Sequence, residues 1–378
     1  MINSILHMRA SANDRRWFKH KFQYWMKEYK GAERQSIVNQ YPLTHEQKQE
    51  IDDFFGTNYG QKIPYDWHQY YAAHSGVFNV QYFPDILFYT YFERFMNPNL
   101  EYNKVLQDKN ILPYVAKSAE VLMPKTIVSF SQGIYRNGDG IVLSYQNVVD
   151  VLHDGGKLFC KPSRGSCGGH GCFCMDFGKE DANVDASLKN LGREFVIQET
   201  VSCDSSIKAI YPDAVNTFRV ITYRWKDEFY LIPAVMRIGH GGAVVDNASS
   251  GGMFISISND GYLQGKAVTK DNKKYAEHPD THIVFDGHKI NNFDKVINAA
   301  MKMHTMIPQI GVVGWDFTID KNGQPLLIEA NIGTVMFYFC QMTLGIPAFG
   351  DRTAEVLQWI CKMKQTPYDK RGQYKFGN

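Results

Sequence analysis

Two carboxylates and an amide near the end of the chain could bind a cation. Asp316 lies in the apolar run Val312–Ile319, and Glu329 and Asn331 lie in or just after the run 325–330. The Asp-Lys-Asn-Gly turn between the two runs predicts an antiparallel hairpin. Because side chains alternate along a strand, all three would then share one face, and their oxygens suit Mg²⁺. The alternative is that arginine or backbone groups satisfy these carboxylates.

A glycine-rich loop follows a lysine at the end of a second predicted strand. Glycine lets backbone N–H groups approach a phosphate closely, and a lysine beside the loop can neutralise a phosphate oxygen. The lysine precedes the glycines, so this is not a Walker A loop. An ordinary surface loop is the alternative. The residues that would bind phosphate are Lys161, Ser163, Gly165, Ser166, Gly168, Gly169 and His170.

Two arginines, Arg219 and Arg237, lie inside strand-like runs rich in aromatic and β-branched residues. An arginine in such a run needs an anion or a carboxylate as its partner. Each arginine could contact a bound anion, or it could form a structural ion pair. The polar, glycine-rich segment 246–252 follows and could close over a ligand.

Short strand-like runs separated by turns begin near residue 106 and predict antiparallel sheets. Apolar residues with helical spacing follow Phe293 and Thr353. Residues 1–105 are aromatic and mostly helical in pattern. We therefore predict an α+β fold in three parts, namely a helical N-terminal region (1–105) and two α+β subdomains (106–200 and 201–378). The predicted strands cover 157–162, 194–200, 217–225, 229–238, 253–258, 262–265, 312–319 and 325–330.

The composition excludes several classes of protein. The 378 residues carry 41 Lys and Arg against 39 Asp and Glu, a net charge of +2, and 44% are hydrophobic. Neither a disordered chain nor a generic nucleic-acid binder has this balance. No apolar run is long enough for a membrane span. The seven cysteines cannot all pair within the chain, and four of them (160, 167, 172 and 174) lack zinc-ligand spacing. These features predict a cytoplasmic protein with reduced thiols.

Taken in order, these motifs resemble the ATP-grasp superfamily of carboxylate–amine ligases. The order is Asp108-Lys109, the Lys161 loop, residues 196–201, the two arginines, Asp316 and Glu329-x-Asn331. The chain is most similar to the sugar-transfer-associated ATP-grasp family of bacterial surface-polysaccharide loci. This narrower match rests on two segments, Val-Asn-Thr-Phe-Arg-Val-Ile-Thr at 215–222 and residues 245–253. The superfamily match covers about residues 106–345, and the narrower one reaches back to about residue 50.

The resemblance implies that two α+β subdomains grip ATP. Lys109 and Lys161 would contact the α/β-phosphates, and Asp204 would contact the ribose. Arg219 would contact the terminal phosphate, and Arg237 either that group or an acyl phosphate. Asp316, Glu329 and Asn331 would hold one or two Mg²⁺ ions. The adenine would be read by the backbone of a connecting strand formed by Gln198, Glu199, Thr200 and Val201.

Two positions depart from the pattern of the family. The ligases often carry an arginine two positions before the first metal aspartate, but this chain has Gly314 there. Arg219 or Arg237 must then supply the charge, or the γ-phosphate is handled differently. His170 stands where relatives often have a lysine, and it either contacts phosphate or is exposed to solvent.

The resemblance further implies an amide-forming ligase with an acyl-phosphate intermediate. Its partners would be ATP, a sugar or polysaccharide precursor that bears a carboxylate, and an amine or amino acid. Two alternatives remain at this point. The first is a phosphotransferase that phosphorylates a sugar or small metabolite, and the second is a nucleotide-binding module without catalysis.

Overall fold

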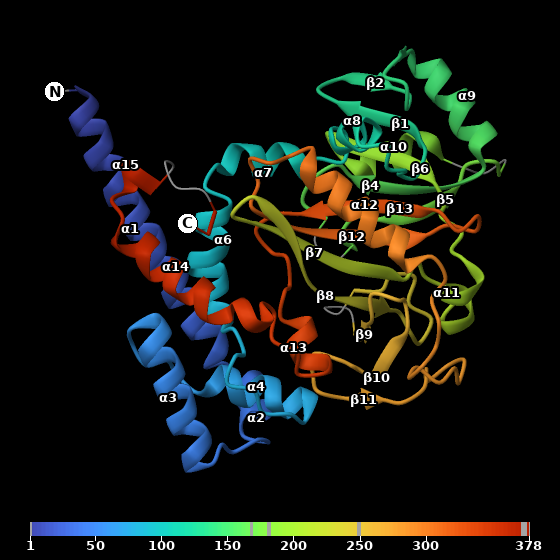
Figure 1. The fold of residues 1–378 in the computed structure, drawn as a ribbon. Coiled ribbons are helices and arrows are strands. Elements are labelled where there is room, and N and C mark those ends of the chain that lie inside the picture. The colour runs from blue at the N-terminus through green and yellow to red at the C-terminus, as the bar shows by residue number, and fades with distance from the viewer. Residues whose placement is uncertain (1, 167–168, 180–182, 248–250, 372–375, 378) are drawn as a thin grey trace.

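The structure is a computed structural model that describes residues 2–166, 169–179, 183–247, 251–371 and 376–377 (Figure 1). Helices come first along the chain, and two antiparallel sheets with further helices follow. The predicted α+β class is therefore confirmed. No helix among these residues is both long and apolar enough to cross a bilayer.

The helical N-terminal region is also confirmed, but it extends further than expected. The helices continue to Ser118 instead of ending near residue 105, because Pro113 suits the first turn of α8 and Leu112 and Ala116 bury its inner side. One segment is a π-helical turn, η1. The helices are α1 (Ile2–Tyr29), α2 (Ala32–Val38), α3 (His45–Tyr59), α4 (Asp66–Ser75), α5 (Asp85–Leu87), η1 (Phe88–Phe92), α6 (Glu93–Met96), α7 (Leu100–Leu106) and α8 (Leu112–Ser118).

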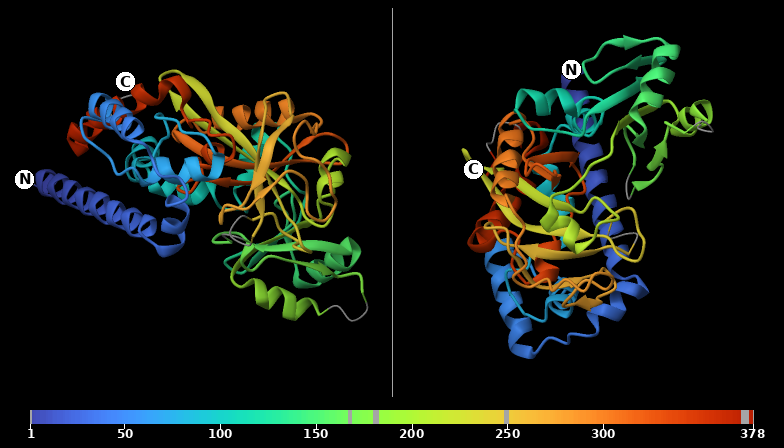
Figure 2. Two further views of the ribbon diagram at one scale, coloured as in Figure 1. Left: turned by 90° about the horizontal axis from the view of Figure 1, so that it is seen from below. Right: turned by 90° about the vertical axis from the view of Figure 1, so that its right-hand side faces the viewer.

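The smaller sheet has the strand order β3-β2-β1-β6-β4-β5 and forms a lobe that projects from the rest of the molecule (Figure 2). The helices α9 (Tyr145–Gly155) and α10 (Val184–Leu191) cover one face, where Leu158 and Ile197 are buried. Because strand residues alternate, Lys161 and Gln198 lie on the other face. The strands are β1 (Thr126–Ser131), β2 (Ile134–Arg136), β3 (Val142–Leu143), β4 (Lys157–Pro162), β5 (Phe173–Asp176) and β6 (Glu194–Glu199).

The larger sheet has the order β11-β10-β9-β8-β7-β12-β13. Its strands β7 and β12 match the predicted runs residue for residue. The short helix α11 (Ser205–Ile210) precedes the sheet in the chain. The strands are β7 (Thr217–Trp225), β8 (Glu228–Ile238), β9 (Met253–Ile257), β10 (Leu263–Val268), β11 (Lys274–Tyr275), β12 (Val312–Ile319) and β13 (Pro325–Asn331).

The two faces of the larger sheet pack against different layers. Helix α12 (Phe293–Thr305) covers the face that carries Phe218, Met236 and Trp315. The opposite face shares one hydrophobic core with the N-terminal helices and with the C-terminal helices α13 (Phe339–Thr343), α14 (Thr353–Gln365) and α15 (Tyr368–Arg371), beside a 3₁₀ turn, η4 (Gly350–Arg352). The helical region therefore directly covers part of this second face.

Candidate functional site

The predicted acidic residues come together on the second face of the larger sheet. The hairpin of β12 and β13 places Asp316 directly opposite Glu329, and Asn331 follows two positions later on the same strand. Asp316 is only 1% exposed, whereas the side chain of Glu329 is 31% exposed. The amide nitrogen of Asn331 is buried and has no hydrogen-bond partner among the described residues.

Both predicted arginines form ion pairs with Asp316. Arg219 lies opposite Asp316 on β7 and contacts it twice, with Nε–Oδ1 at 2.6 Å and Nη2–Oδ2 at 3.1 Å. Arg237 on β8 reaches Oδ2 of the same carboxylate with Nη2 at 3.0 Å. This buried aspartate is thus held by two guanidinium groups.

A second buried carboxylate, Asp246, supports Arg237. The Nη2 atom of Arg237 lies 3.5 Å from Oδ1 of Asp246 and donates to Oγ1 of Thr217 at 2.7 Å. The Thr217 hydroxyl and backbone N–H both donate to Asp246 Oδ2, at 2.5 and 2.9 Å. The sequence reading placed Asp246 in a segment that closes over a ligand, and only the long-range pairing of strands reveals its contact with Arg237.

Burial and ion pairing act in opposite directions on these acids. Burial acts to raise the pKa of Asp316, but Arg219 and Arg237 outweigh it and hold that pKa below its usual value. For Asp246, burial is the stronger effect and raises the pKa despite the attraction of Arg237. The ion pairs with Arg219 and Arg237 therefore favour the charged form of Asp316.

Two lysines approach the acids from the side of the smaller sheet. Nζ of Lys109 lies 3.4 Å from Oε2 of Glu329, and the Lys109 backbone N–H donates to the carbonyl of Ser163 at 3.0 Å. Lys161 is buried, and burial together with the charge of Lys109 lowers its pKa to about 8. Glu329 opposes this shift, but Lys161 forms no ion pair with a described residue, so a bound anion would stabilise its charge.

The glycine-rich loop starts beside these lysines. Gly165 and Gly169 have φ values of +73° and +79°, which a residue with a side chain adopts only under strain. The Ser163 hydroxyl is buried and lacks a partner among the described residues, Ser166 accepts a backbone hydrogen bond from Gly169 at 3.0 Å, and His170 is exposed. Gly168 lies outside the described residues.

The residues expected near adenine and ribose lie at the end of β6 and just beyond it. The Gln198 side chain donates to the carbonyl of Pro124 at 3.1 Å, and Glu199 forms an exposed ion pair with Lys125 at 3.3 Å. Thr200 is exposed and Val201 half-buried. Asp204 caps α11 through the backbone N–H and hydroxyl of Ser206, at 2.9 and 2.6 Å.

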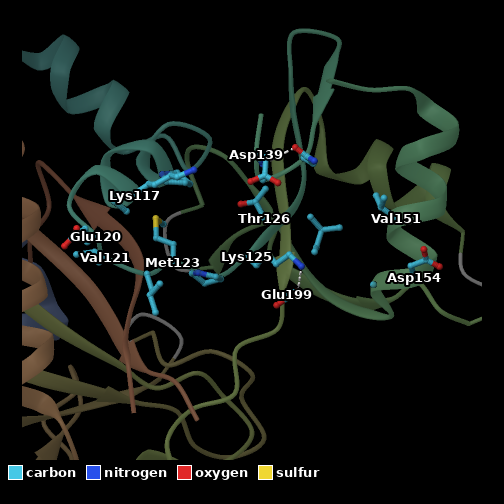
Figure 3. Close-up of a pocket in the computed structure, with 18 residues that line it drawn as sticks. Lys117, Glu120, Val121, Met123, Lys125, Thr126, Asp139, Val151, Asp154 and Glu199 are labelled. Atoms are coloured by element: carbon cyan, nitrogen blue, oxygen red, sulfur yellow. Dashed lines mark hydrogen bonds and ion pairs between the residues drawn. The ribbon is translucent and has the colours of Figure 1, made fainter. Parts of the chain in front are cut away.

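A cavity of about 790 Å³ opens beside this segment (Figure 3). It is lined by the connection from α8 to β1, by the turn between β2 and β3, and by the end of α9, with Lys125 and Glu199 at one side. Lys161, Asp316 and the other residues of the ionic cluster do not line it. This hollow is therefore distinct from the charged cluster.

The structure gives a physical reason for glycine at position 314. A Cβ atom there would lie 3.2 Å from Cβ and 3.3 Å from Cα of Val335. Arg219 donates to the carbonyl of this same Val335 at 2.8 Å. The space beside Gly314 is thus closed, and Arg219 brings its charge to Asp316 from the neighbouring strand.

The acidic residues fit a hard cation such as Mg²⁺. Asp316 and Glu329 present carboxylate oxygens side by side, Glu329 is partly accessible, and Asn331 follows on the same strand. Carboxylate and amide oxygens are the ligand types that this ion prefers. The set therefore has the right donor chemistry and a shared face.

Comparison with known proteins supports one family. The model of a family described as sugar-transfer associated ATP-grasp matches residues 87–355. No curated protein matches the chain. Among solved structures, it is similar to the D-Ala:D-Ser ligase VanG from Enterococcus faecalis, with 14% identity, a TM-score of 0.42 and coverage of 68% of this chain and 61% of that chain.

Two other similar structures share less of their length with it. An L-amino acid ligase from Bacillus licheniformis has 13% identity and a TM-score of 0.39, with coverage of 68% of this chain and 48% of that chain. An N5-carboxyaminoimidazole ribonucleotide synthetase in complex with ADP has 12% identity and a TM-score of 0.36, with coverage of 60% of this chain and 45% of that chain. The chain thus spans less than two thirds of each of the three structures. Because the family model covers well over half of its residues, the chain belongs to the sugar-transfer associated ATP-grasp family.

Proposed function

We propose that this protein is an ATP-dependent carboxylate–amine ligase that works through an acyl phosphate. It would attach an amine or amino acid to the carboxylate of a sugar in surface-polysaccharide biosynthesis. Family membership supports the use of ATP. The observation that carries the proposal is the cluster in which two lysines and two arginines surround Asp316 and Glu329.

The positive groups of the cluster suit a triphosphate. Lys109 and Lys161 would bind the α/β-phosphates, and the glycine-rich loop would cover them with backbone N–H groups. Arg219 and Arg237 would stabilise the negative charge that develops on the transferred phosphoryl group. The adenine would contact the backbone of residues 198–201, and Asp204 would lie near the ribose.

Asp316, Glu329 and Asn331 would hold magnesium. When bound, this ion neutralises phosphate oxygens and orients them for in-line transfer. The chain's own part is to hold the two carboxylates in fixed positions, which the strand pairing and the arginine contacts achieve.

The proposed reaction has two steps. A substrate carboxylate oxygen attacks the γ-phosphorus of ATP, the bond to the β–γ bridging oxygen breaks, and ADP leaves. The amine nitrogen then attacks the acyl carbon, loses a proton and expels inorganic phosphate, which leaves an amide. Positioning and charge stabilisation account for most of the catalysis, and exclusion of water protects the acyl phosphate.

Product analysis tests this function. With a matched pair of uronic acid and amine, we expect equal amounts of ADP, inorganic phosphate and amide, and none of them from Glu329→Gln. ADP and a phosphorylated product without free phosphate would instead identify a phosphotransferase. Failure to bind magnesium–ATP in calorimetry would overturn the nucleotide site itself.

A further inference from the structure

The ionic cluster lies on the second face of the larger sheet, which the N-terminal and C-terminal helices cover. Helix α13 attaches to this face through a hydrogen bond between the hydroxyls of Thr343 and Ser256 at 2.6 Å and a stacked contact of Phe339 with Phe254 at 4.2 Å. Figure 1 shows α4 and α13 beside the edge formed by β10 and β11. Residues near α13 are therefore placed between the cluster and the N-terminal helices.

The first notable group there is Arg34 on α2. Its guanidinium carbon lies 4.3 Å from the ring centre of Tyr29 and 5.2 Å from that of Tyr70. Its one hydrogen bond to a described residue is a long contact of 3.4 Å from Nη1 to Asp85. The side chain is 24% exposed, and Nε and Nη2 form no hydrogen bond with a described residue.

Asp85 forms an ion pair with Arg34, and its charge helps to raise the pKa of that guanidinium; the same carboxylate also accepts from two tyrosines. The Tyr71 hydroxyl donates to Oδ1 at 2.5 Å, and the Tyr29 hydroxyl donates to Oδ2 at 3.1 Å. Burial raises the pKa of Asp85, and the charge of Arg34 only partly opposes this. Asp85 and the rings of Tyr29 and Tyr70 fix the position of the Arg34 guanidinium and leave its other N–H groups unbonded among the described residues.

A second cation, Lys270, lies close to Arg34. Its backbone carbonyl is 3.4 Å from Nε2 of His74, whose ring packs at 4.5 Å against Tyr70. The Lys270 ammonium makes no hydrogen bond or ion pair with any described residue. Burial lowers its pKa, and the charge of Arg34 lowers it further, while the carboxylate of Glu33 opposes the shift. Two half-buried cations that repel each other favour binding of an anion between them.

Tyr338 connects this pair to the ionic cluster. It directly precedes α13 and follows Val335, whose carbonyl accepts from Arg219. Burial and the charge of Asp85 raise the pKa of the Tyr338 hydroxyl, and Arg34 and Arg219 oppose that rise, so the hydroxyl lies within electrostatic reach of both arginines. No described residue forms a hydrogen bond with this hydroxyl, which makes it available as a donor to a ligand.

We propose that Arg34, Lys270 and Tyr338 form a second anion-binding site, which holds a carboxylate of the substrate away from the reacting centre. An arginine and a lysine recognise a carboxylate by charge-assisted hydrogen bonds, and the tyrosine hydroxyl adds a neutral donor. The inference rests on the proposed ligase function, in which the sugar carboxylate reacts and the carboxylate of the amino acid does not, so the amino acid supplies this group.

Calorimetry on the full chain tests the site. L-alanine, its methyl ester and D-glucuronate are titrated with and without a saturating nonhydrolysable ATP analogue and magnesium. L-alanine should bind more tightly than its ester. Lys270→Gln and Arg34→Gln should weaken that binding about tenfold, whereas Lys266→Gln, which alters an exposed lysine of β10, should not.

The probes and variants separate the possible results. Binding of alanine that both variants weaken supports the proposal, whereas variants that weaken only the binding of glucuronate would place the reacting carboxylate here and overturn it. Binding that is unchanged in Lys270→Gln and Arg34→Gln, or equal binding of the ester, overturns it. If the ATP analogue binds and no carboxylate does, this inference fails alone; if the analogue does not bind, the proposed function fails.

Discussion

Arg219 and Asp316 face each other on neighbouring strands and form a two-point ion pair, with contacts of 2.6 and 3.1 Å. The same guanidinium donates to the carbonyl of Val335, in the segment that follows Asn331. One side chain therefore fixes both a candidate metal ligand and the connection to α13. The consequences for stability and binding can be tested separately.

Asp316→Asn should destabilise the protein by about 3 kcal/mol, because it leaves Arg219 and Arg237 buried with a neutral partner. Urea unfolding at pH 7 without nucleotide measures the loss. The matched control is Glu199→Gln, which removes the exposed ion pair with Lys125 and should cost less than about 1 kcal/mol. Similar losses in the two variants would contradict the buried ion-pair arrangement.

ATP binding near pH 8 should take up protons through Lys161. Burial and Lys109 lower the pKa of Lys161 to about 8, so roughly half of the molecules are uncharged there. A bound phosphate favours the charged form and raises the pKa, and affinity should therefore fall as the pH rises above 8. Calorimetry in buffers of different ionisation enthalpy measures the uptake.

In this experiment, Lys161→Met should abolish the proton uptake of about half a proton per ATP. Lys157→Met, which changes an exposed lysine at the start of the same strand β4, should preserve it. Undiminished uptake in Lys161→Met would assign the proton to a different group.

The local elements of the site could be predicted from the sequence because their signals are short-range. The Asp-Lys-Asn-Gly turn and the alternating runs beside it fixed the hairpin that pairs Asp316 with Glu329. The contact of Asp316 with Arg219 could not be predicted in this way, because it depends on the pairing of strands 97 residues apart. On the sequence alone, either arginine could equally have contacted a bound anion.

The helical region shows a similar limit. The pattern of residues 1–105 predicted helices, but no local pattern indicated which sheet face these helices would cover. The position of Arg34 near Lys270 follows only from the packing of α4 against the loop after β10, where Asn272 donates to the carbonyl of Ala73 at 3.3 Å. Such placement depends on the whole core.

His304 should make the protein sensitive to acid. Burial lowers the pKa of this histidine to about 4, and Nδ1 lies 2.7 Å from the Thr222 hydroxyl, which also accepts from Trp315 Nε1 at 2.8 Å. His304 binds its proton at a higher pH in the unfolded chain than in the folded protein. The stabilisation is therefore complete above about pH 6.5 and is lost as the pH falls toward 4. The full effect is about 3 kcal/mol.

Free energies of unfolding at pH 7 and 4.5 check this prediction. His304→Gln should be less stable than the wild type at pH 7 but should lose less stability on acidification. His282→Asn is the control, because His282 is exposed and has a φ of +58°, which asparagine tolerates. If His304→Gln and the wild type lose the same stability between pH 7 and 4.5, His304 is not held in its neutral form by burial.

Glu93 should produce the opposite dependence on pH. Burial raises its pKa to about 8, against the attraction of Lys21 and hydrogen bonds from the backbone N–H groups of Gly333 and Val335. The folded state then holds a proton that the unfolded chain releases above about pH 4.5, so this contribution to stability falls as the pH rises from 4.5 to 8. The total change is about 5 kcal/mol.

Glu93→Gln should remove this dependence, because the amide stays neutral and can still accept from the segment 333–335. Relative to the wild type, the variant should therefore gain stability as the pH is raised from 5 to 8.5, as measured by urea unfolding. Glu101→Gln, at an exposed position of α7, should follow the wild-type profile. A Glu93→Gln profile parallel to the wild type would mean that Glu93 has the same pKa in the folded and the unfolded protein, and that burial does not keep it protonated.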